Sequence, residues 1–329
     1  MYKPNELKQD VKGVYKRHPK LKTYIKSLKD PVSINVDINN LKKYLSEGPW
    51  EYKSEYAPNE TFTYSWSSMA RDLNLYAIKL KIDSFKSCFS GDNTWTKDFK
   101  ESIEYEYWAL KLDLKFHDMA FKEFNEGQRV KLSMLFLRDA GVTLGSCIAL
   151  GWLDYADELM TGINNNLKNT CFSDAYDRSS RRRTQHFILR LLSHYNGTDE
   201  IQKELDIKCA YDVPLFNRLV ENWATEDTKY LSELLIQAAD RHTHQCRQDS
   251  WNNNRFYDFQ NWDLEYYYPF EILAIERLRK LKGLTTPRIE HRILDTPLGQ
   301  LLEYTPPEKP KFLMGLLDRA SKEFPSIKS

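Results

Sequence analysis

The chain has 329 residues, of which 41% are hydrophobic and 29% charged, a composition that excludes a disordered or collagen-like chain. Its 48 basic and 47 acidic side chains give a net charge of +1, so no overall field would draw it to nucleic acid or an anionic membrane. The 12 glycines are about half of the usual share of roughly 7%, which disfavours glycine-punctuated β-folds and predicts a mostly helical protein.

The first half of the chain is predicted to begin with short helices and loops and to continue with two long helices. Pro19, Pro31 and Pro49 interrupt the segment before Thr61. Beyond it, apolar residues recur at steps of three and four on either side of a turn at 90–93, which predicts two long antiparallel helices. The apolar positions are Leu75, Ile78, Ile82, Phe85 and Phe89 in the first helix, and Phe99, Ile103, Tyr107, Leu110, Leu114, His117, Phe121 and Phe124 in the second.

A third helix is predicted over 128–150 and a shorter one over 154–167. Gly141 and Gly145 lie on the apolar seam of the third helix, where they would let a neighbouring backbone approach. The polar break that runs from the asparagines at 164–166 to Asp174 predicts a domain boundary. Further helices are expected at 176–195, 198–205, 214–223, 225–246, 268–282 and 310–324, and the proline-rich stretch 304–310 should be extended.

These patterns predict an all-α fold. The helices would form either two helical domains, 1–172 and 173–329, or one elongated body with long antiparallel helix pairs. The five cysteines are odd in number and widely spaced, which favours reduced thiols and a cytoplasmic location. The amino terminus lacks the apolar core of a secretory signal, and Arg138 and Asp139 break the most apolar stretch, so no membrane-spanning helix is expected.

His242, His244 and Cys246, with His291 downstream, raise the question of a zinc site. On a helix His242 and His244 would point ~200° apart and could not share an ion, whereas His242 and Cys246 could. His242 also continues the apolar stripe that passes through Leu234. A buried, hydrogen-bonded histidine is therefore the preferred interpretation, and no metal or cofactor is expected.

Asp113 and Lys115 match the Asp-x-Lys fragment of magnesium-dependent nucleases. That fragment normally lies on a strand, whereas here it flanks Leu114 in a helical seam, so a solvated helix edge is the preferred interpretation. The basic cluster of Arg178, Arg181, Arg182 and Arg183 could grip phosphates. It lacks stacking aromatic residues and follows two aspartates, which favours salt bridges to acidic helices, so nucleic acid is not an expected partner.

The segment 249–276 mixes aromatic residues with six acids and one base. Flat amphipathic rings among carboxylates are typical of specific protein interfaces, and they also fill the space between helices. Both roles are expected here, with some rings in each. The residues proposed for a partner-binding patch are Asp258, Trp262, Asp263, Glu265, Tyr266 and Tyr267.

The same segment carries a resemblance to a known family. The stretches HTHQCRQDSWNNNRFYDFQNWDLEYYYPFEILAIERLRKLKGL and IEHRILDTPLGQLLE resemble the carboxy-terminal domain of immunity proteins that protect bacteria against polymorphic nuclease effectors. The matching features include Arg247, the helix entry at 268–274, Glu290-His291 and the Thr-Pro-Leu-Gly turn at 296–299. About one hundred residues are covered, and the long helices before them are consistent with that family's helical amino-terminal domain.

The resemblance implies a non-enzymatic, all-helical antitoxin. Such a protein binds a cognate DNase toxin, commonly delivered by a contact-dependent route such as type VI secretion, and covers its active or DNA-binding site in the cytoplasm of the producing cell. Acidic aromatic segments would complement the basic groove of a nuclease. A helical scaffold for several partners and, less favoured, a magnesium-dependent nuclease using Asp113 and Lys115 are the alternatives. A monomer and a homodimer are both compatible with the sequence.

Overall fold

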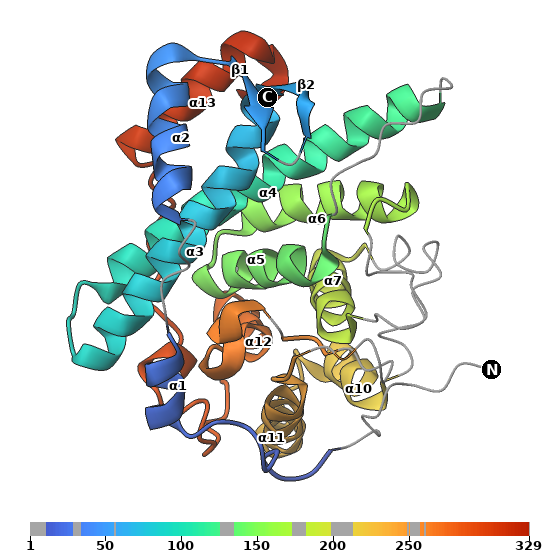
Figure 1. Ribbon diagram of the computed structural model, residues 1–329. Coiled ribbons are helices and arrows are strands. Elements are labelled where there is room, and N and C mark those ends of the chain that lie inside the picture. The colour runs from blue at the N-terminus through green and yellow to red at the C-terminus, as the bar shows by residue number, and fades with distance from the viewer. Residues whose placement is uncertain are drawn as a thin grey trace. The chain divides into compact units, whose positions relative to one another are not determined.

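The computed structural model shows a mostly helical chain with one small two-stranded sheet among the residues that it describes (Figure 1). The described residues are 11–28, 34–55, 57–125, 135–172, 182–198, 213–248, 250, 257–259 and 261–328. The chain divides into two compact units. Unit 1 contains Met1–Leu28 and Lys131–Thr305, and unit 2 contains Lys29–Val130 and Pro306–Ser329.

Unit 2 is built on two long helices that form an antiparallel pair, as the apolar spacing predicts (Figure 1). The first of the pair ends at Ser90, and the residue after it, Gly91, has a φ of +83°, which favours glycine. The helices of unit 2 are α2 (Ile34–Glu47), α3 (Trp66–Ser90), α4 (Trp95–Asn125), α13 (Lys311–Glu323) and the 3-10 helix η4 (Pro325–Lys328). Helix α2 packs against α3, and α13 packs against α2.

A buried ion pair joins α3 to α4. The Lys81 Nζ lies 2.5 Å from the Glu106 Oε1, and their side chains are only 2% and 8% exposed. Removing either partner would leave the other charge in an apolar environment, which costs about 3–5 kcal/mol. The pair therefore specifies how the two helices align as well as holding them together.

Unit 2 also contains a β-hairpin that the helical prediction missed. Its strands are β1 (Trp50–Ser54) and β2 (Ala57–Tyr64), paired antiparallel with Trp50 opposite Tyr64. Most of its side chains are exposed, so neither strand shows the strong apolar alternation by which a half-buried strand is recognised.

Unit 1 packs around α5, whose residues from Ala140 to Leu150 are all buried. The neighbours of α5 are α6, α7 and α12. The elements of unit 1 are α1 (Leu21–Ser27), α5 (Leu137–Leu150), α6 (Leu153–Lys168), α7 (Arg183–Asn196), α10 (Pro214–Asn222), α11 (Thr228–Gln245), η2 (Asn261–Tyr267), α12 (Phe270–Leu281) and η3 (Pro297–Gly299).

Residues 11–28, here called the strap, return to the carboxy-terminal half of unit 1. The Gly13 amide donates to the Asp240 Oδ2 at 2.6 Å, and the Tyr15 amide donates to the Thr243 Oγ1 at 2.9 Å. Further along, the Tyr24 hydroxyl donates to the backbone carbonyl of Leu264 at 2.9 Å. The beginning of the chain thus contacts residues of the same unit that lie more than two hundred positions later.

The predicted helices agree with the described ones in kind and differ at several ends. The third predicted helix starts at Leu137, and the helix predicted over 176–195 starts at Arg183. Residues 128–134 and 176–181 of those two predictions, and residues 199–205 of the helix predicted over 198–205, lie outside the described residues. Residues 135, 136, 182 and 198 are described and are not helical. The stretch 304–310 has no helix or strand, as predicted. No helix among the described residues is long and apolar enough to cross a membrane.

The predicted boundary between residues 172 and 173 does not coincide with the division into units. Helices α5 and α6 precede that boundary, yet they belong to the same unit as α7 and α12, which follow it. The reason is that α5 buries its apolar surface against helices from both sides of the polar break. A polar loop marks a surface crossing of the chain and need not mark the edge of a core.

Gly145 should be intolerant of a side chain. A Cβ at this position would lie 2.2 Å from the Cδ2 of the Phe270 ring, so Gly145→Ala should destabilise unit 1 by about 1–3 kcal/mol, measured by urea denaturation. Gly315→Ala is the matched control in helix α13, because its Cβ would meet only the tip of Leu45 and alanine improves helix propensity by about 1 kcal/mol. Equal stability changes in the two variants would contradict the close packing of α5.

Candidate functional site

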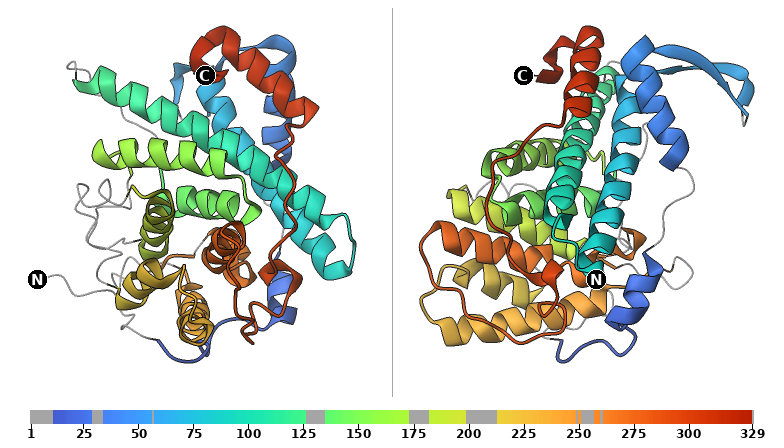
Figure 2. Two further views of the ribbon diagram at one scale, coloured as in Figure 1. Left: turned by 180° about the vertical axis from the view of Figure 1, so that it is seen from behind. Right: turned by 90° about the vertical axis from the view of Figure 1, so that its left-hand side faces the viewer.

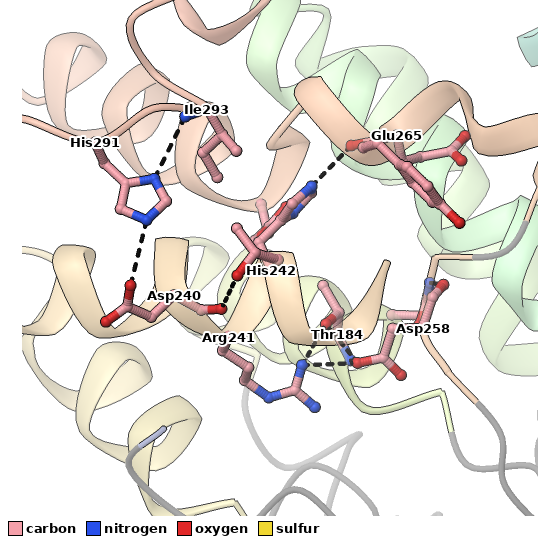
Figure 3. Close-up of polar contacts among 12 residues, drawn as sticks. Thr184, Asp240, Arg241, His242, Asp258, Glu265, His291 and Ile293 are labelled. Carbon is pink, nitrogen blue, oxygen red and sulfur yellow. Dashed lines mark hydrogen bonds and ion pairs between the residues drawn. The ribbon is translucent and has the colours of Figure 1, made fainter. Parts of the chain in front are cut away.

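The strongest concentration of buried polar groups in unit 1 surrounds the end of α11 (Figure 3). Consecutive residues Asp240, Arg241 and His242 point to different neighbours, because successive side chains on a helix are rotated by about 100°. We call the group around them the polar core. It comprises Thr184, Asp240, Arg241, His242, Asp258, Glu265, Glu271 and His291.

Asp258 is fully buried and is surrounded by donors. Its carboxylate accepts the backbone amides of Arg183 at 3.0 Å and Thr184 at 3.2 Å. It also accepts the Thr184 hydroxyl at 2.7 Å and the Arg241 guanidinium at 2.9 Å (Figure 3). The carboxylate therefore compensates a charged group on α11 and the first amides of α7 at once.

This arrangement explains how α7 begins. Its N-cap residue, Arg182, makes no side-chain capping hydrogen bond, so the first amides of the helix need acceptors from elsewhere. Asp258 supplies them from 75 residues later in the chain, at the helix end where negative charge is favoured. Burial alone would raise the pKa of Asp258, but Arg241, the Thr184 hydroxyl and Arg183 outweigh it and hold this pKa below its ordinary value.

His242 is clamped between two acceptors. Its Nε2 lies 2.7 Å from the Glu265 carbonyl oxygen, and its Nδ1 lies 2.7 Å from the Glu271 Oε1. A carbonyl can only accept, so Nε2 carries a proton that it donates to Glu265. The second contact then needs one further proton, held either by Nδ1 or by the Glu271 carboxyl group. The two side chains thus share a proton in a site that water does not reach.

His291 links Asp240 to the loop after α12. Its Nε2 lies 3.3 Å from the Asp240 Oδ1, and its Nδ1 accepts the Ile293 amide at 3.4 Å (Figure 3). A ring that donates at one nitrogen and accepts at the other is neutral. Burial, the largest effect, lowers the pKa of His291, and this agrees with the neutral form.

A further buried histidine, His18 of the strap, lies close to this network. It is 4% exposed, and its Nε2 lies 3.0 Å from the Tyr266 carbonyl oxygen. Burial, the largest effect, and the neighbouring His242, Arg292 and His291 together lower the pKa of His18 to about 3, against the opposing effect of the hydrogen bond to Tyr266. The His18 imidazole is therefore neutral where the strap packs against the rest of unit 1.

The structure places the proposed partner-binding residues mostly in the interior. Asp258, Glu265, Tyr266 and Tyr267 are 0%, 2%, 8% and 1% exposed, so these four side chains do not form the accessible patch that the sequence suggested. The side chains of Trp262 and Asp263 lie outside the described part of the chain. The partner-binding role of the segment stays a prediction, while the role of Asp258 shown here is structural.

For Tyr266 and Tyr267 the strap is the reason for this difference. The Tyr24 ring stacks with Tyr266 at 6.4 Å and contacts Tyr267 at 5.0 Å between centroids. The Tyr267 hydroxyl in turn donates to the Pro19 carbonyl at 2.8 Å. Because this cover comes from the beginning of the chain, no local pattern in 249–276 could separate buried rings from exposed ones.

The preferred interpretation of His242 as a buried, hydrogen-bonded side chain is confirmed. Its two ring nitrogens are engaged by Glu265 and Glu271, and within the described ranges no three histidine, cysteine or acidic side chains are grouped to hold a metal ion. Thr184, Asp240 and His18 were not singled out from the sequence. Nothing in the sequence indicated that α7 needs a distant acceptor, because its start at Arg183 is known only from the structure.

Asp113 and Lys115 lie on α4, as the helical interpretation predicts. Two residues apart on a helix, their side chains point to different sides. The Lys115 Nζ lies 5.4 Å from the centre of the Phe324 ring. Burial, the largest effect, raises the pKa of Asp113 to about 6. In the basic cluster, Arg182 and Arg183 are buried, and Arg182 donates to the Tyr257 carbonyl, while Arg178 and Arg181 lie outside the described residues.

Comparisons of the chain with protein-family models, with curated proteins and with solved structures gave no match. Several residues of the polar core belong to the segments that carry the family resemblance. His242, Asp258, Glu271 and His291 lie within the two resembling stretches, and all of them are buried in unit 1. The turn at Gly299 is equally constrained, since a Cβ there would lie 2.2 Å from the Ile293 carbonyl oxygen.

Asp258→Ala should destabilise unit 1 by about 3–5 kcal/mol, because the change leaves a buried guanidinium and two helix amides without their acceptor. Urea denaturation measures the loss. Asp227→Ala is the matched control: Asp227 caps α11 by accepting the Tyr230 amide at 2.9 Å, but it is exposed, so the loss should be about 1 kcal/mol. A loss at Asp258 no larger than at Asp227 would show that the buried carboxylate is dispensable.

Stability should fall as the solution is acidified. The folded protein keeps His18 neutral down to about pH 3, whereas the unfolded chain binds a proton near pH 6.5. Between these values the unfolded state holds more protons, so acid favours unfolding by roughly 1.4 kcal/mol per pH unit for this group. Urea midpoints recorded between about pH 4 and pH 7 test this.

The contribution of His18 can be isolated by substitution. His18→Gln keeps a donor for the Tyr266 carbonyl and has no titrating ring, so its stability should depend less steeply on pH than that of the wild type. Tyr24→Phe, which removes one strap hydrogen bond and keeps the imidazole, is the control and should retain the wild-type slope. An unchanged slope in His18→Gln would refute the assignment.

Proposed function

We propose that this chain is an immunity protein that binds a cognate secreted DNase and blocks it in the cytoplasm of the cell that makes both. The observation that supports this is the convergence of the resembling residues. His242, Asp258, Glu271 and His291 are spread over 50 positions of the sequence, yet each belongs to one of three buried hydrogen-bonded groups around the end of α11.

This convergence gives the resemblance physical content. Buried polar groups must be satisfied together, so residues of such a network depend on one another. The pair of His242 and Glu271 needs the Glu265 carbonyl, and Asp258 needs Arg241 and the start of α7. The contacts of His242 with Glu265 and Glu271 lie wholly within the resembling stretches, which supports a resemblance to a folded unit. The immunity role comes to this chain with that resemblance.

The mechanism proposed is occlusion. A protein that covers the DNA-binding groove of a nuclease competes with a polyanion, so local acidic surface would speed its encounter with the basic groove. Protection against a single toxin molecule calls for tight binding, with a Kd of about 1 nM or below, equivalent to ~12 kcal/mol. Desolvated aromatic side chains would then slow dissociation.

The proposal predicts that a nuclease domain is encoded beside this chain's gene, and the test uses that domain. Plasmid cleavage by that purified domain should stop when this protein is added at a one-to-one ratio, and bacteria that express the nuclease should survive only when they also express this chain. Asp258→Ala should lose protection in proportion to its lost stability. Full cleavage in the presence of excess folded protein would contradict the proposal.

A further inference from the structure

The β-hairpin of unit 2 is held firmly at its base. The Trp50 and Tyr64 rings stack with centroids 4.0 Å apart and an angle of 10° between their planes. The Tyr64 hydroxyl donates to the Asp72 Oδ2 at 2.7 Å, and the Tyr44 ring contacts Tyr64 at 5.8 Å. The hairpin is therefore attached to α2 and α3 by buried aromatic packing and a hydrogen bond, which fixes its direction.

Beyond this base the hairpin leaves the helices of its own unit. The right-hand view of Figure 2 shows both strands running outward past α2. On one face Tyr52 and Phe62 form a cross-strand aromatic pair 5.8 Å apart, and Tyr52 is 40% exposed. On the other face Glu51, Lys53 and Thr63 are exposed.

A hairpin whose strands extend away from the rest of the protein gains little stability from its surroundings. A single two-stranded hairpin is marginally stable in water, and strand edges that no further strand covers invite pairing with other chains. In the part of the chain that the structure describes, the sheet consists of β1 and β2 alone. An anchored hairpin whose aromatic pair is partly exposed is therefore a candidate contact surface for another molecule.

The charge of the hairpin indicates what that partner is. Glu51, Glu55 and Glu60 are exposed, against the single exposed base Lys53. None of these three carboxylates forms an ion pair with another described residue. An anionic projection that carries amphipathic rings complements a concave, positively charged protein surface, where the rings would be desolvated and the carboxylates would meet cations.

We propose that the hairpin 50–64 is the surface by which this protein engages the cationic groove of a partner protein. This inference rests on the proposed function, in which that groove is the DNA-binding groove of the nuclease. It moves the contact from the aromatic segment of unit 1, whose described side chains are largely buried, to an element of unit 2. The carboxylates guide the approach to the groove, and the Tyr52 and Phe62 rings slow release.

The test measures binding of the neighbouring nuclease domain to full-length variants. The triple variant Glu51→Lys, Glu55→Lys, Glu60→Lys should associate about tenfold more slowly or worse at low salt, with a smaller difference at high salt. Tyr52→Ala should instead raise the dissociation rate by about tenfold. These positions are exposed, so circular dichroism and the thermal midpoint should stay near those of the wild type.

The matched control carries the same change of net charge in unit 1. Glu221, Glu226 and Glu233 are exposed on and between α10 and α11, and their reversal to Lys should slow association by less than about threefold. Equal effects of the two triple variants, or unchanged binding by both hairpin variants, would overturn the hairpin assignment while the proposed function stands. Wild-type protein that fails to inhibit the nuclease would overturn both.

A second copy of this chain is the competing occupant. In that case the free wild-type protein would run as a dimer in sedimentation, and the hairpin variants would run as monomers. This result would also overturn the proposal. Hydrogen exchange of the nuclease complex supplies an independent measurement, because the amides of β1 and β2 should become protected on binding.

Discussion

Unit 1 depends on the requirement that every charge buried in its interior finds a partner. The Asp258 carboxylate answers this requirement for two elements at once, since it pairs with Arg241 on α11 and receives the first amides of α7. The free-energy cost of removing a carboxylate from water is compensated only when several well-placed donors contact it. The position of Asp258 is thus tied to the start of α7 and the end of α11 together.

The same requirement explains the strap. Asp240 accepts from Gly13 and His291, and the Tyr266 carbonyl accepts from His18, so residues from the beginning of the chain complete polar contacts made by its second half. A network of this kind is strong when complete and expensive when a member is missing. The strap should therefore fold together with the core of unit 1, where it covers Tyr266 and Tyr267.

In the function proposed above, the two units have different roles. The residues that carry the family resemblance lie in unit 1 and are largely occupied with one another, which suits a stable frame. The exposed, acidic and aromatic element lies in unit 2, on a hairpin anchored by Trp50 and Tyr64. A rigid base beneath an exposed contact element lowers the entropy that binding must overcome.

The sequence alone determined the helical class and the long pair α3 and α4, because these follow from periodicity within one stretch of chain. It also placed Gly145 on a closely packed seam, but only the structure shows that the Phe270 ring fills the space beside it. The sequence also indicated that His242 would be buried, since His242 continues an apolar stripe. Only the tertiary structure decided that Asp258 caps α7, that the strap covers Tyr266 and Tyr267, and that α5 joins helices from both sides of the polar break. These features arise from contacts between residues up to 248 positions apart, and nothing in a local pattern records which distant segment supplies a donor or a cover. The sequence did not predict the hairpin, because its exposed strands carry little of the apolar alternation that marks a half-buried strand.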